Sequence, residues 1–569
     1  MESGKGEKQS GASILVKLLE RQGISMVAGI PGGANLPLYD ALATSGIRHV
    51  LTRHEQGAGF IAQGMARVTG TPQVFLATSG PGATNTLTAI ADAKLDSVPI
   101  ICITGQVPSP MIGTDAFQEV DIYGMSLPVT KHNFLVRTTE ELLEVVPEAF
   151  RIAASGRPGP VLIDVPKDVQ AAQICVNQWP EPGQADPYPA LDLEAIEQAA
   201  QMINEAERPV LYIGGGVSQS GAASAAMCLA MRSSIPVAQT LMGLGAIPRD
   251  HILDLGMLGM HGARFTNYIL EECDLLISLG VRFDDRATGK VEQFCPDASI
   301  IHVDIDPGEL DKIKTAHVGV TADAGEFLAA LMPMVEAKAR AGWLSRVAEL
   351  KAEHPFRTPG ARDPRSPYGL ILEAAKRMGE KVNVATDVGQ HQMRTAQVYP
   401  LTKPGQLLTS GGLGTMGFGL PAAIGAALAD PDTPVLCVGG DGSLLMNIQE
   451  LATAVEQRAN VKILLMNNGG LGLVRQQQEL FYDNNLFASE YTHCVDYVTI
   501  AKGFGMNAID LAHASDPGAA LEAAFATPGP CLIHAPIMEP ENVYPMVPPG
   551  AANSDMIGGE HAHSEPCTA

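Results

Sequence analysis

Two polar turns late in the chain have the residue types that could hold a metal ion and a phosphate. The apolar run 435–438 leads into Gly-Gly-Asp-Gly-Ser with Asp441 at its centre, and a second apolar run, 461–466, leads into Asn-Asn-Gly-Gly, which contains Asn468. In a βαβ unit the carboxyl ends of both strands share one edge of the sheet, so Asp441 and Asn468 would meet there. One carboxylate, one amide oxygen and the Gly470 carbonyl would suit Mg²⁺, which takes its other ligands from phosphates and water.

The glycines of these turns would let a diphosphate approach the backbone, and the N-terminus of the helix expected after Gly442 would favour its negative charge. The alternative is an ordinary strand–turn–helix with a polar turn, but Gly-Asp-Gly combined with Asn-Asn favours the binding site. The pattern resembles the motif that binds thiamine diphosphate and Mg²⁺. Gly440, Gly442 and Ser443 are then candidate cofactor contacts beside Asp441.

Composition and charge limit the class of protein. With 569 residues, 46% of them hydrophobic and 18% charged, the chain is typical of a globular protein with several domains. Its formal net charge of −24 argues against nucleic acid or an anionic membrane as a partner. No run approaches the roughly 18 apolar residues of a membrane span. The polar start, 1–10, lacks the core of a signal peptide, and nine cysteines without a CxxC pair indicate a reducing compartment. We therefore expect a cytoplasmic protein.

The two ends of the chain repeat one plan. The apolar run and Gly-x-Gly turn of 74–82 match those of 435–442, and the Pro-Gly-Pro segment of 158–166 recurs at 528–536. Only the later turn has an aspartate at its centre, because Pro81 stands at that place in the earlier one. We therefore expect two α/β domains of similar plan that differ in chemistry.

A third α/β segment lies between these two and is bounded by the proline-rich stretches 178–190 and 353–366. Its strands are expected over 210–213, 275–279 and 300–305, and its helices over 193–206 and 221–233. The predicted fold class is α/β, with three doubly wound parallel-sheet domains, of which the first and third share a plan around a central one. The expected boundaries are 10–177, 191–345 and 366–545 for the domains and 546–569 for a flexible tail.

Glu55 follows a short strand expected over 49–51 and opens a helix in the run Arg-His-Glu-Gln-Gly-Ala-Gly. A carboxylate at such a position is ordinarily a helix cap or a partner of the helix dipole. Thiamine chemistry, however, needs a carboxyl group against the pyrimidine ring nitrogen, because that hydrogen bond favours the imino tautomer that removes the thiazolium C2 proton. Glu55 is the leading candidate for this group.

A set of motifs spread from about residue 11 to residue 545 closely resembles the large, catalytic subunit of acetohydroxyacid synthase, also called acetolactate synthase. The motifs are GIPGG (29–33), RHEQGAGF (53–60), TSGPGATN (78–85), TGQVP (104–108), GTDAFQE (113–119), SGRPGPVLIDVPKDV (155–169), RFDDRATG (282–289), GQHQM (389–393) and GGDGS with NNGG. The resemblance implies that pyruvate is decarboxylated on thiamine diphosphate and that its two-carbon unit is joined to a second 2-ketoacid, pyruvate or 2-ketobutyrate. This is the first common step of branched-chain amino acid biosynthesis.

The resemblance also implies roles for individual residues. Glu55 would activate the cofactor, and the Mg²⁺ ligands would be Asp441, Asn468 and the Gly470 carbonyl. The diphosphate loop would be Gly389, Gln390 and His391, and the contacts to the aminopyrimidine would be Gly414 and Met416. The substrate site would contain Gly33, Phe117, Gln118 and Lys167, with Arg286 binding the second ketoacid.

The RFDDR motif of the central segment is characteristic of the biosynthetic synthases, which bind FAD. The implied flavin contacts are Arg157, Gly215, Thr240, Leu241, Gly280, Arg282, Asp304, Ile305 and Asp323. Independently of the resemblance, Asp304 ends an expected strand, where a carboxylate can accept hydrogen bonds from ribose hydroxyls. For Arg282 and Arg286 the alternative role is a surface ion pair with Asp284 or Asp285, although an arginine fork also suits a ketoacid carboxylate.

The resemblance implies a homodimer or larger assembly, with Glu55 and the diphosphate site meeting across the subunit interface, and a small regulatory subunit. Gln477 stands where many members of the family have a tryptophan, so a strong preference for 2-ketobutyrate over pyruvate is not implied. Two other functions remain open from the sequence. One is a flavin-using pyruvate oxidase, which would consume an electron acceptor; the other is a non-catalytic paralogue, against which Glu55, Asp441 and Asn468 count.

Overall fold

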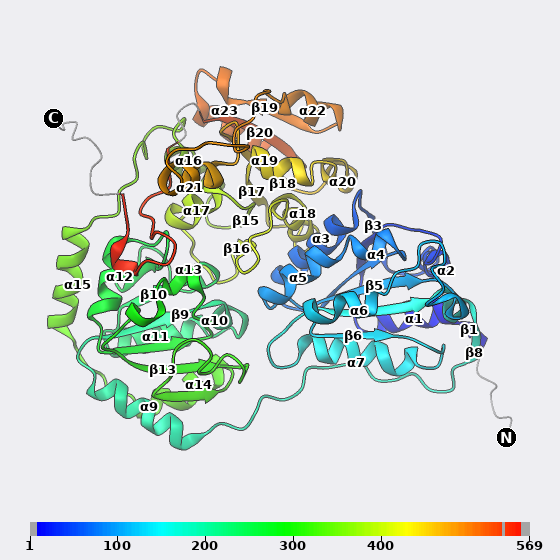
Figure 1. The fold of residues 1–569 in the computed structure, drawn as a ribbon, viewed down its shortest axis with the longest axis horizontal. Helices are drawn as coiled ribbons and strands as arrows, with labels where there is room; N and C mark the ends of the chain where they lie inside the picture. The colour runs from blue at the N-terminus through cyan, green and yellow to red at the C-terminus, as the bar shows by residue number, and fades with distance from the viewer. Residues whose placement is uncertain (1–7, 538–540, 559–569) are drawn as a thin grey trace.

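Three α/β units make up the computed structural model, which describes residues 8–537 and 541–558 (Figure 1). Each unit contains one six-stranded sheet in which every strand pairing is parallel. The inner strands are buried on both faces because helices cover both sides of each sheet, which explains their nearly continuous apolar sequences. The predicted fold class is confirmed.

The N-terminal unit has the strand order β3-β2-β4-β5-β7-β6. Its strands are β2 (Met26–Gly29), β3 (Arg48–Leu51), β4 (Gln73–Ala77), β5 (Ile100–Gln106), β6 (His132–Leu135) and β7 (Val161–Pro166). The side chains of each strand alternate between faces, so Val74 and Leu76 pack with α1 (Gly11–Arg21) and α7 (Leu142–Ala154), while Phe75 packs with α3 (Glu55–Thr69) and α5 (Leu87–Leu95).

The C-terminal unit repeats this order as β16-β15-β17-β18-β20-β19, which confirms the predicted duplication. Its strands are β15 (Asn383–Thr386), β16 (Leu407–Leu408), β17 (Val435–Gly440), β18 (Val461–Asn467), β19 (Asn507–Asp510) and β20 (Cys531–Pro536). Helices α16 (Pro367–Met378), α17 (Gln390–Val398) and α23 (Pro517–Ala526) cover one face, and α18 (Gly419–Ala429) and α22 (Tyr497–Gly503) cover the other. The helix expected after Gly442 is two helices, α19 (Asp441–Met446) and α20 (Glu450–Gln457).

The central unit has the strand order β11-β10-β9-β12-β13-β14. Its strands are β9 (Pro209–Ile213), β10 (Val237–Gln239), β11 (Asp254–Met257), β12 (Leu275–Leu279), β13 (Ser299–Asp304) and β14 (Val318–Thr321). Its main helices are α9 (Leu193–Glu205), α11 (Ala223–Arg232), α12 (Arg264–Glu272), α14 (Ala324–Leu331) and α15 (Ala341–Glu353). The direction of strand succession reverses between β9 and β12, and ligands bind at such a switch point in open α/β sheets.

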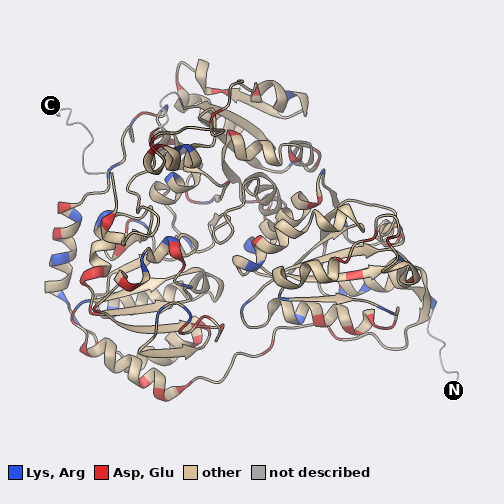
Figure 2. Cartoon of the chain, viewed as in Figure 1, with Lys and Arg blue, Asp and Glu red and all other residues tan. Residues whose placement is uncertain are grey.

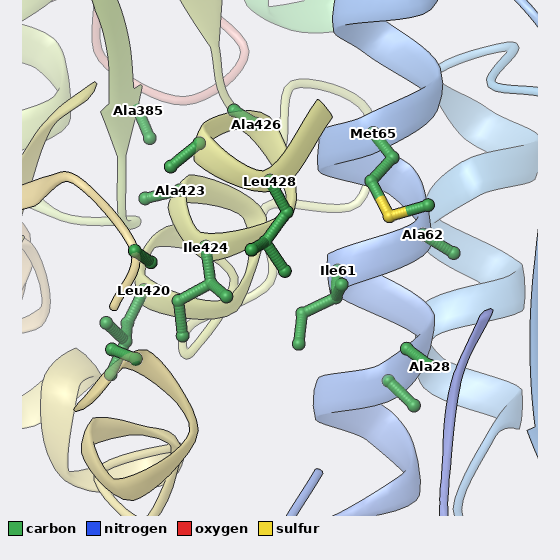
Figure 3. Packing of buried hydrophobic residues seen from close by; sticks show 14 of the residues in the cluster. Ala28, Ile61, Ala62, Met65, Ala385, Leu420, Ala423, Ile424, Ala426 and Leu428 are labelled. Carbon is green, nitrogen blue, oxygen red and sulfur yellow. The ribbon is translucent and has the colours of Figure 1, made fainter. Parts of the chain in front are cut away.

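Helices α3 and α18 join the N-terminal and C-terminal units through one shared apolar core (Figure 3). Ile61 and Met65 of α3 face Ile424 and Leu428 of α18 in this core. The two backbones approach so closely that a Cβ at Gly64 would lie 2.0 Å from the Ala422 carbonyl oxygen. The small residues that mark both helices in the sequence are therefore a requirement of this crossing.

The segment after β20 returns to the central unit. Val547 N donates to Met260 O at 2.9 Å, and Asn553 Nδ2 donates to Ala287 O at 2.8 Å. Residues 546–558 thus differ from the flexible tail that we expected there, because their backbone groups and apolar side chains find partners on the central unit. Residues 559–569 lie outside the described part of the chain.

Charged residues lie mainly along surface helices such as α9 and α15, whereas the strands of the three sheets are largely uncharged (Figure 2). Within residues 8–537 and 541–558, the structure contains no helix that is both long and apolar enough to span a membrane.

Candidate active site

The carboxyl ends of β17 and β18 bring the two predicted turns together, since Gly440 pairs with Met466 in the parallel ladder. A cavity of about 170 Å³ lies at this edge. The predicted cofactor residues that line it are Gly389, Gln390, His391, Gly414, Met416, Gly440, Asp441, Gly442, Ser443, Asn468 and Gly470. The structure therefore gathers every C-terminal residue that the sequence indicated for thiamine diphosphate and Mg²⁺.

The Asp441 carboxylate, the Asn468 amide and the Gly470 carbonyl converge in this cavity. One terminal atom of the Asn468 amide lies 2.9 Å from the Gly470 carbonyl oxygen and 3.2 Å from Asp441 Oδ1. With the amide nitrogen at that place, Asn468 donates to both oxygens. With Oδ1 there, Asn468 Nδ2 donates to Gln390 Oε1 at 3.3 Å, and the three oxygens that then meet call for a cation.

The donor chemistry of this cluster fits Mg²⁺, a hard cation that takes oxygen ligands. Asp441 Oδ2 is buried and has no hydrogen-bond partner among the described residues. Burial raises the pKa of Asp441, as expected for a carboxylate that lacks its counter-ion. The described residues contain no group of three or more His, Cys, Asp or Glu side chains that could hold a metal. A metal in this cavity would therefore rely on amide and carbonyl oxygens beside the one carboxylate.

A pocket of glycines surrounds His391 at the start of α17. A Cβ at either Gly389 or Gly440 would lie 2.8 Å from His391 Cε1, so only glycine leaves room for the imidazole. Burial lowers the pKa of His391 to about 3, and its Nε2 has no hydrogen-bond partner in the described chain. A neutral imidazole with an unused nitrogen, beside a helix N-terminus, fits a diphosphate.

The predicted residues of the N-terminal unit lie at the carboxyl edge of their own sheet. Glu55 is the first residue of α3, and Asn85 Nδ2 donates to its Oε2 at 3.0 Å. Gly33 follows β2, Phe117 and Gln118 follow β5, and Lys167 follows β7 as the first residue of α8 (Lys167–Ala171). These residues line neither the cavity of the C-terminal unit nor the larger one of the central unit. A single chain thus gathers them at one edge but does not bring them to the diphosphate pocket.

A second cavity of about 680 Å³ lies at the switch point of the central sheet. It is lined by all the predicted flavin residues, namely Arg157, Gly215, Thr240, Leu241, Gly280, Arg282, Asp304, Ile305 and Asp323. Val388, Gly414 and Leu473 line both cavities, so the two adjoin. The volume lies in the range of about 300–1,000 Å³ that is typical of ligand and cofactor sites.

Several of these flavin candidates already have protein partners. Arg157 Nη1 donates to Glu309 Oε1 at 2.7 Å, and Asp323 caps α14. Arg282 Nη1 donates to the Leu95 carbonyl oxygen at 2.6 Å, which links the central unit to α5. Burial raises the pKa of Asp304 to about 6 at the end of β13. The cavity therefore has preformed walls to which all three units contribute.

Arg286 lines the central cavity with few constraints. Its side chain is 63% exposed, and its Nε lies 3.8 Å from Asp285 Oδ2. Asp284 instead caps α13 (Asp285–Thr288), accepting a hydrogen bond from the Arg286 backbone N–H at 3.1 Å. The surface ion pair that we considered for Arg286 exists only as this long contact with Asp285. Gln477, on α21 (Gly472–Phe481), lines the same cavity and is exposed.

Two buried carboxylates that no sequence motif indicated, Asp387 and Asp96, hold loops around the cavities. Asp387 accepts hydrogen bonds from Gly417 N at 2.8 Å and Gly419 N at 3.1 Å, and burial raises its pKa to about 6. Asp96 of the N-terminal unit accepts from Gly411 N and Gly412 N at 3.0 and 2.7 Å. Their partners are backbone groups distant in sequence, so the only available signal was an acidic residue among apolar neighbours.

Three family models match successive parts of the chain. They describe thiamine pyrophosphate enzymes and cover the N-terminal TPP-binding domain at 9–125, the central domain at 196–331 and the C-terminal TPP-binding domain at 387–535. These matches agree with the cofactor that the cavity of the C-terminal unit fits.

Curated relatives match almost the whole chain. The large subunit of acetolactate synthase isozyme 1 from Escherichia coli is 60% identical over 550 residues, which cover 96% of this chain and 98% of that protein. The large subunit of isozyme 2 is 46% identical and covers 96% and 99%, and chloroplastic acetolactate synthase 1 from Nicotiana tabacum is 45% identical and covers 97% and 85%. The resemblance seen in the sequence motifs is confirmed: the chain belongs to the acetolactate synthase large-subunit family of thiamine pyrophosphate enzymes.

Proposed function

We propose that the chain decarboxylates pyruvate and ligates the two-carbon unit to a second 2-ketoacid, giving acetolactate from pyruvate and acetohydroxybutyrate from 2-ketobutyrate. The observation that carries this proposal is the oxygen cluster of Asp441, Asn468 and Gly470 beside the neutral His391, which together suit a metal diphosphate. When bound, thiamine diphosphate supplies the carbon nucleophile and the electron sink for decarboxylation. The relatives are synthases, which counts against a pyruvate oxidase and against a non-catalytic paralogue.

The side chains and carbonyl groups that line the two cavities support specific assignments for the metal, the diphosphate and the flavin. Mg²⁺ would be held by Asp441 Oδ1, Asn468 Oδ1 and the Gly470 carbonyl, and the diphosphate by Gly389, Gln390 and His391. FAD would occupy the central cavity, whose volume and position at a switch point suit a dinucleotide. Neither half-reaction needs a net electron transfer, so the flavin would have a structural role. Arg286, at the flavin cavity but largely free of partners, would bind the carboxylate of the second ketoacid.

A homodimer is the assembly that we propose, because Glu55 and the substrate residues Gly33, Gln118 and Lys167 lie at an edge that lacks a diphosphate pocket. Exposed apolar side chains at the carboxyl edges of both thiamine units support such a contact. Phe117 is 86% exposed at the first edge, and Met446 and Phe487 are exposed at the second. Glu55 of one subunit would then meet the cofactor of the other.

Two finer assignments complete the proposal. The two Escherichia coli relatives are named as large subunits, so we propose that this chain also works with a small regulatory subunit. We further propose domain boundaries at 10–177, 191–345 and 366–545, which the three separate sheets support.

The test is to mix the purified chain with pyruvate and to measure acetolactate, omitting thiamine diphosphate, Mg²⁺ or FAD in turn. We expect product only when all three are present, without uptake of oxygen or reduction of a quinone. Pyruvate-dependent consumption of an electron acceptor without acetolactate would instead identify an oxidase. Cofactor binding without turnover of pyruvate would identify a non-catalytic paralogue.

A further inference from the structure

Glu450 is a fully buried carboxylate that no cofactor or substrate role accounts for. It is the first residue of α20 in the C-terminal unit, yet it reaches the N-terminal unit, where Arg53 N donates to its Oε1 at 3.0 Å. The backbone of His54 hydrogen-bonds to the same carboxyl group. Thr453 Oγ1 donates to its Oε2 at 2.6 Å. Glu450 thus satisfies backbone N–H groups at the entrance of a helix that belongs to another unit.

The first turn of α3 is shaped around this carboxylate. A Cβ at Gly57 would lie 2.6 Å from Glu450 Oε1, so the side chain fits only because residue 57 is a glycine. Asn447, three residues before Glu450, extends the contact, since its Nδ2 donates to Gln56 Oε1 at 3.3 Å and to Gly417 O at 2.7 Å. Backbone and side chains on both sides of Glu55 are therefore held by the C-terminal unit.

Glu55 itself is held from the opposite side. Its Oε2 accepts a hydrogen bond from Asn85 Nδ2 at 3.0 Å, which directs the carboxyl group toward the turn after β4. The ion pair near this point, between Arg53 and Glu456, joins side chains that are 31% and 46% exposed. Exposed pairs of this kind contribute little. Glu450 is thus the principal buried contact that fixes the backbone from which the Glu55 side chain projects.

We propose that Glu450 is a positioning residue for the proposed cofactor-activating group Glu55, fixing the first turn of α3 so that the Glu55 carboxyl group meets the pyrimidine ring. The inference rests on the proposed role of Glu55. Glu450 lines neither cavity and does not touch the cofactor site, so it acts only through Glu55. Burial raises the pKa of Glu450, and the donated hydrogen bonds and the positive end of the α3 dipole oppose that rise.

The test uses two substitutions that remove different parts of this contact. Glu450→Ala removes the whole carboxyl group. Glu450→Gln keeps the oxygen that accepts from Arg53 N, and its new NH₂ group can donate to Thr453 Oγ1 once that hydroxyl rotates. The matched control is Asp254→Ala in the central unit, a buried carboxylate that accepts from Gln239 Nε2 at 2.7 Å and Gly256 N at 3.0 Å.

Three quantities are measured for each variant: the affinity for thiamine diphosphate by calorimetry, the thermal unfolding midpoint, and the rate of C2-proton exchange of the bound cofactor by NMR. Glu450→Ala should bind the cofactor within about twofold of wild type, because Glu450 does not line the cavity of the metal cluster and the ligands stay intact. Its exchange should slow by about 10²-fold, the usual result of a misplacement near 1 Å. Glu450→Gln should recover most of that rate, and Asp254→Ala should lower the unfolding midpoint without slowing exchange.

A double variant separates positioning from an independent effect. If Glu450 acts through Glu55, then Glu55→Gln with Glu450→Ala should exchange no more slowly than Glu55→Gln alone. The inference is overturned if Glu450→Ala slows exchange in the Glu55→Gln background by the same factor as in the wild-type background. It is also overturned if folded Glu450→Ala exchanges at the wild-type rate. If Glu450→Ala does not fold, a rate in Glu450→Gln as low as that of Glu55→Gln would also overturn it. Wild-type exchange in Glu55→Gln itself would overturn the proposed role of Glu55.

Discussion

Replacing Arg286 with alanine should impair use of the second ketoacid far more than decarboxylation of the first pyruvate. In the structure the side chain is 63% exposed, and its one ion-pair partner among the described residues, Asp285, lies 3.8 Å away and is 81% exposed. A pair this exposed adds little to stability. We therefore expect Arg286→Ala to change the free energy of unfolding by no more than about 0.5 kcal/mol. Any large kinetic effect would then belong to substrate binding and not to misfolding.

The size of the effect follows from the exposure of the side chain. Hydrogen bonds to charged groups contribute about 1.5–3 kcal/mol, and water competes for a guanidinium that is mostly exposed. We take the lower end, about 1.5 kcal/mol, which corresponds to about a tenfold rise in the concentration of second ketoacid needed for ligation. Arg286→Lys retains the charge but loses the planar fork, so its effect should be intermediate.

The assay is the partition of pyruvate between acetolactate and released acetaldehyde, with bound FAD measured by flavin absorbance in the same samples. We expect the alanine variant to release more acetaldehyde and to recover acetolactate formation at high acceptor concentration. Equal loss of decarboxylation and ligation, with FAD retained, would refute the reasoning. Loss of FAD would instead assign Arg286 to the flavin.

Three further predictions test the remaining site. Asp441→Ala removes the only anionic ligand of the oxygen cluster, so the affinity for thiamine diphosphate measured by calorimetry should fall severely and its Mg²⁺ dependence should change. Unchanged binding would mean that Asp441 is only a turn residue. Gln477→Trp should raise the ratio of acetohydroxybutyrate to acetolactate from mixed ketoacids by about tenfold, since an apolar wall discriminates one methylene by about 1–3 kcal/mol; a wild-type ratio already strongly favouring acetohydroxybutyrate would place the selecting wall elsewhere. Burial lowers the pKa of His391 to about 3, below its ordinary value near 6.5, so its contribution to stability is complete above about pH 6.5 and is lost as the pH falls toward 3. Urea unfolding of the cofactor-free protein should therefore show that His391→Gln loses less stability than wild type between pH 7 and pH 5, and parallel losses would contradict the buried neutral imidazole.

Local sequence was sufficient to predict the main elements of the fold because the inner strands are buried on both faces and therefore form continuous apolar runs. The runs 435–438 and 461–466 became β17 and β18, and the repeated plan of the two ends became the same strand order in two sheets. One expected helix was interrupted because a neighbouring side chain found a backbone partner distant in sequence. The helix after Gly442 stops at Met446, and Asn447 then donates to the carbonyl of Gly417, a partner that no local pattern indicates.

The cofactor residues were predictable for a related reason. Asp441 and Asn468 end neighbouring parallel strands, so the topology alone brings them to one edge, and their oxygen chemistry indicates the metal. The sequence also showed where the glycines lie, although it did not predict which group each glycine makes room for. Gly57 makes room for Glu450, and Gly64 makes room for the backbone of α18.

By itself, then, the sequence determined the three parallel sheets, the family and the residue types of the diphosphate pocket, because these depend on hydrophobic periodicity and on short motifs at strand ends. Only the tertiary structure decided how the units lock together. Glu450, Asp96 and Asp387 hold backbone N–H groups of segments distant in sequence, and a backbone N–H has the same chemistry in every residue but proline. Such partners leave no pattern in the sequence, since the chain must fold before it is known which amide each buried carboxylate will meet.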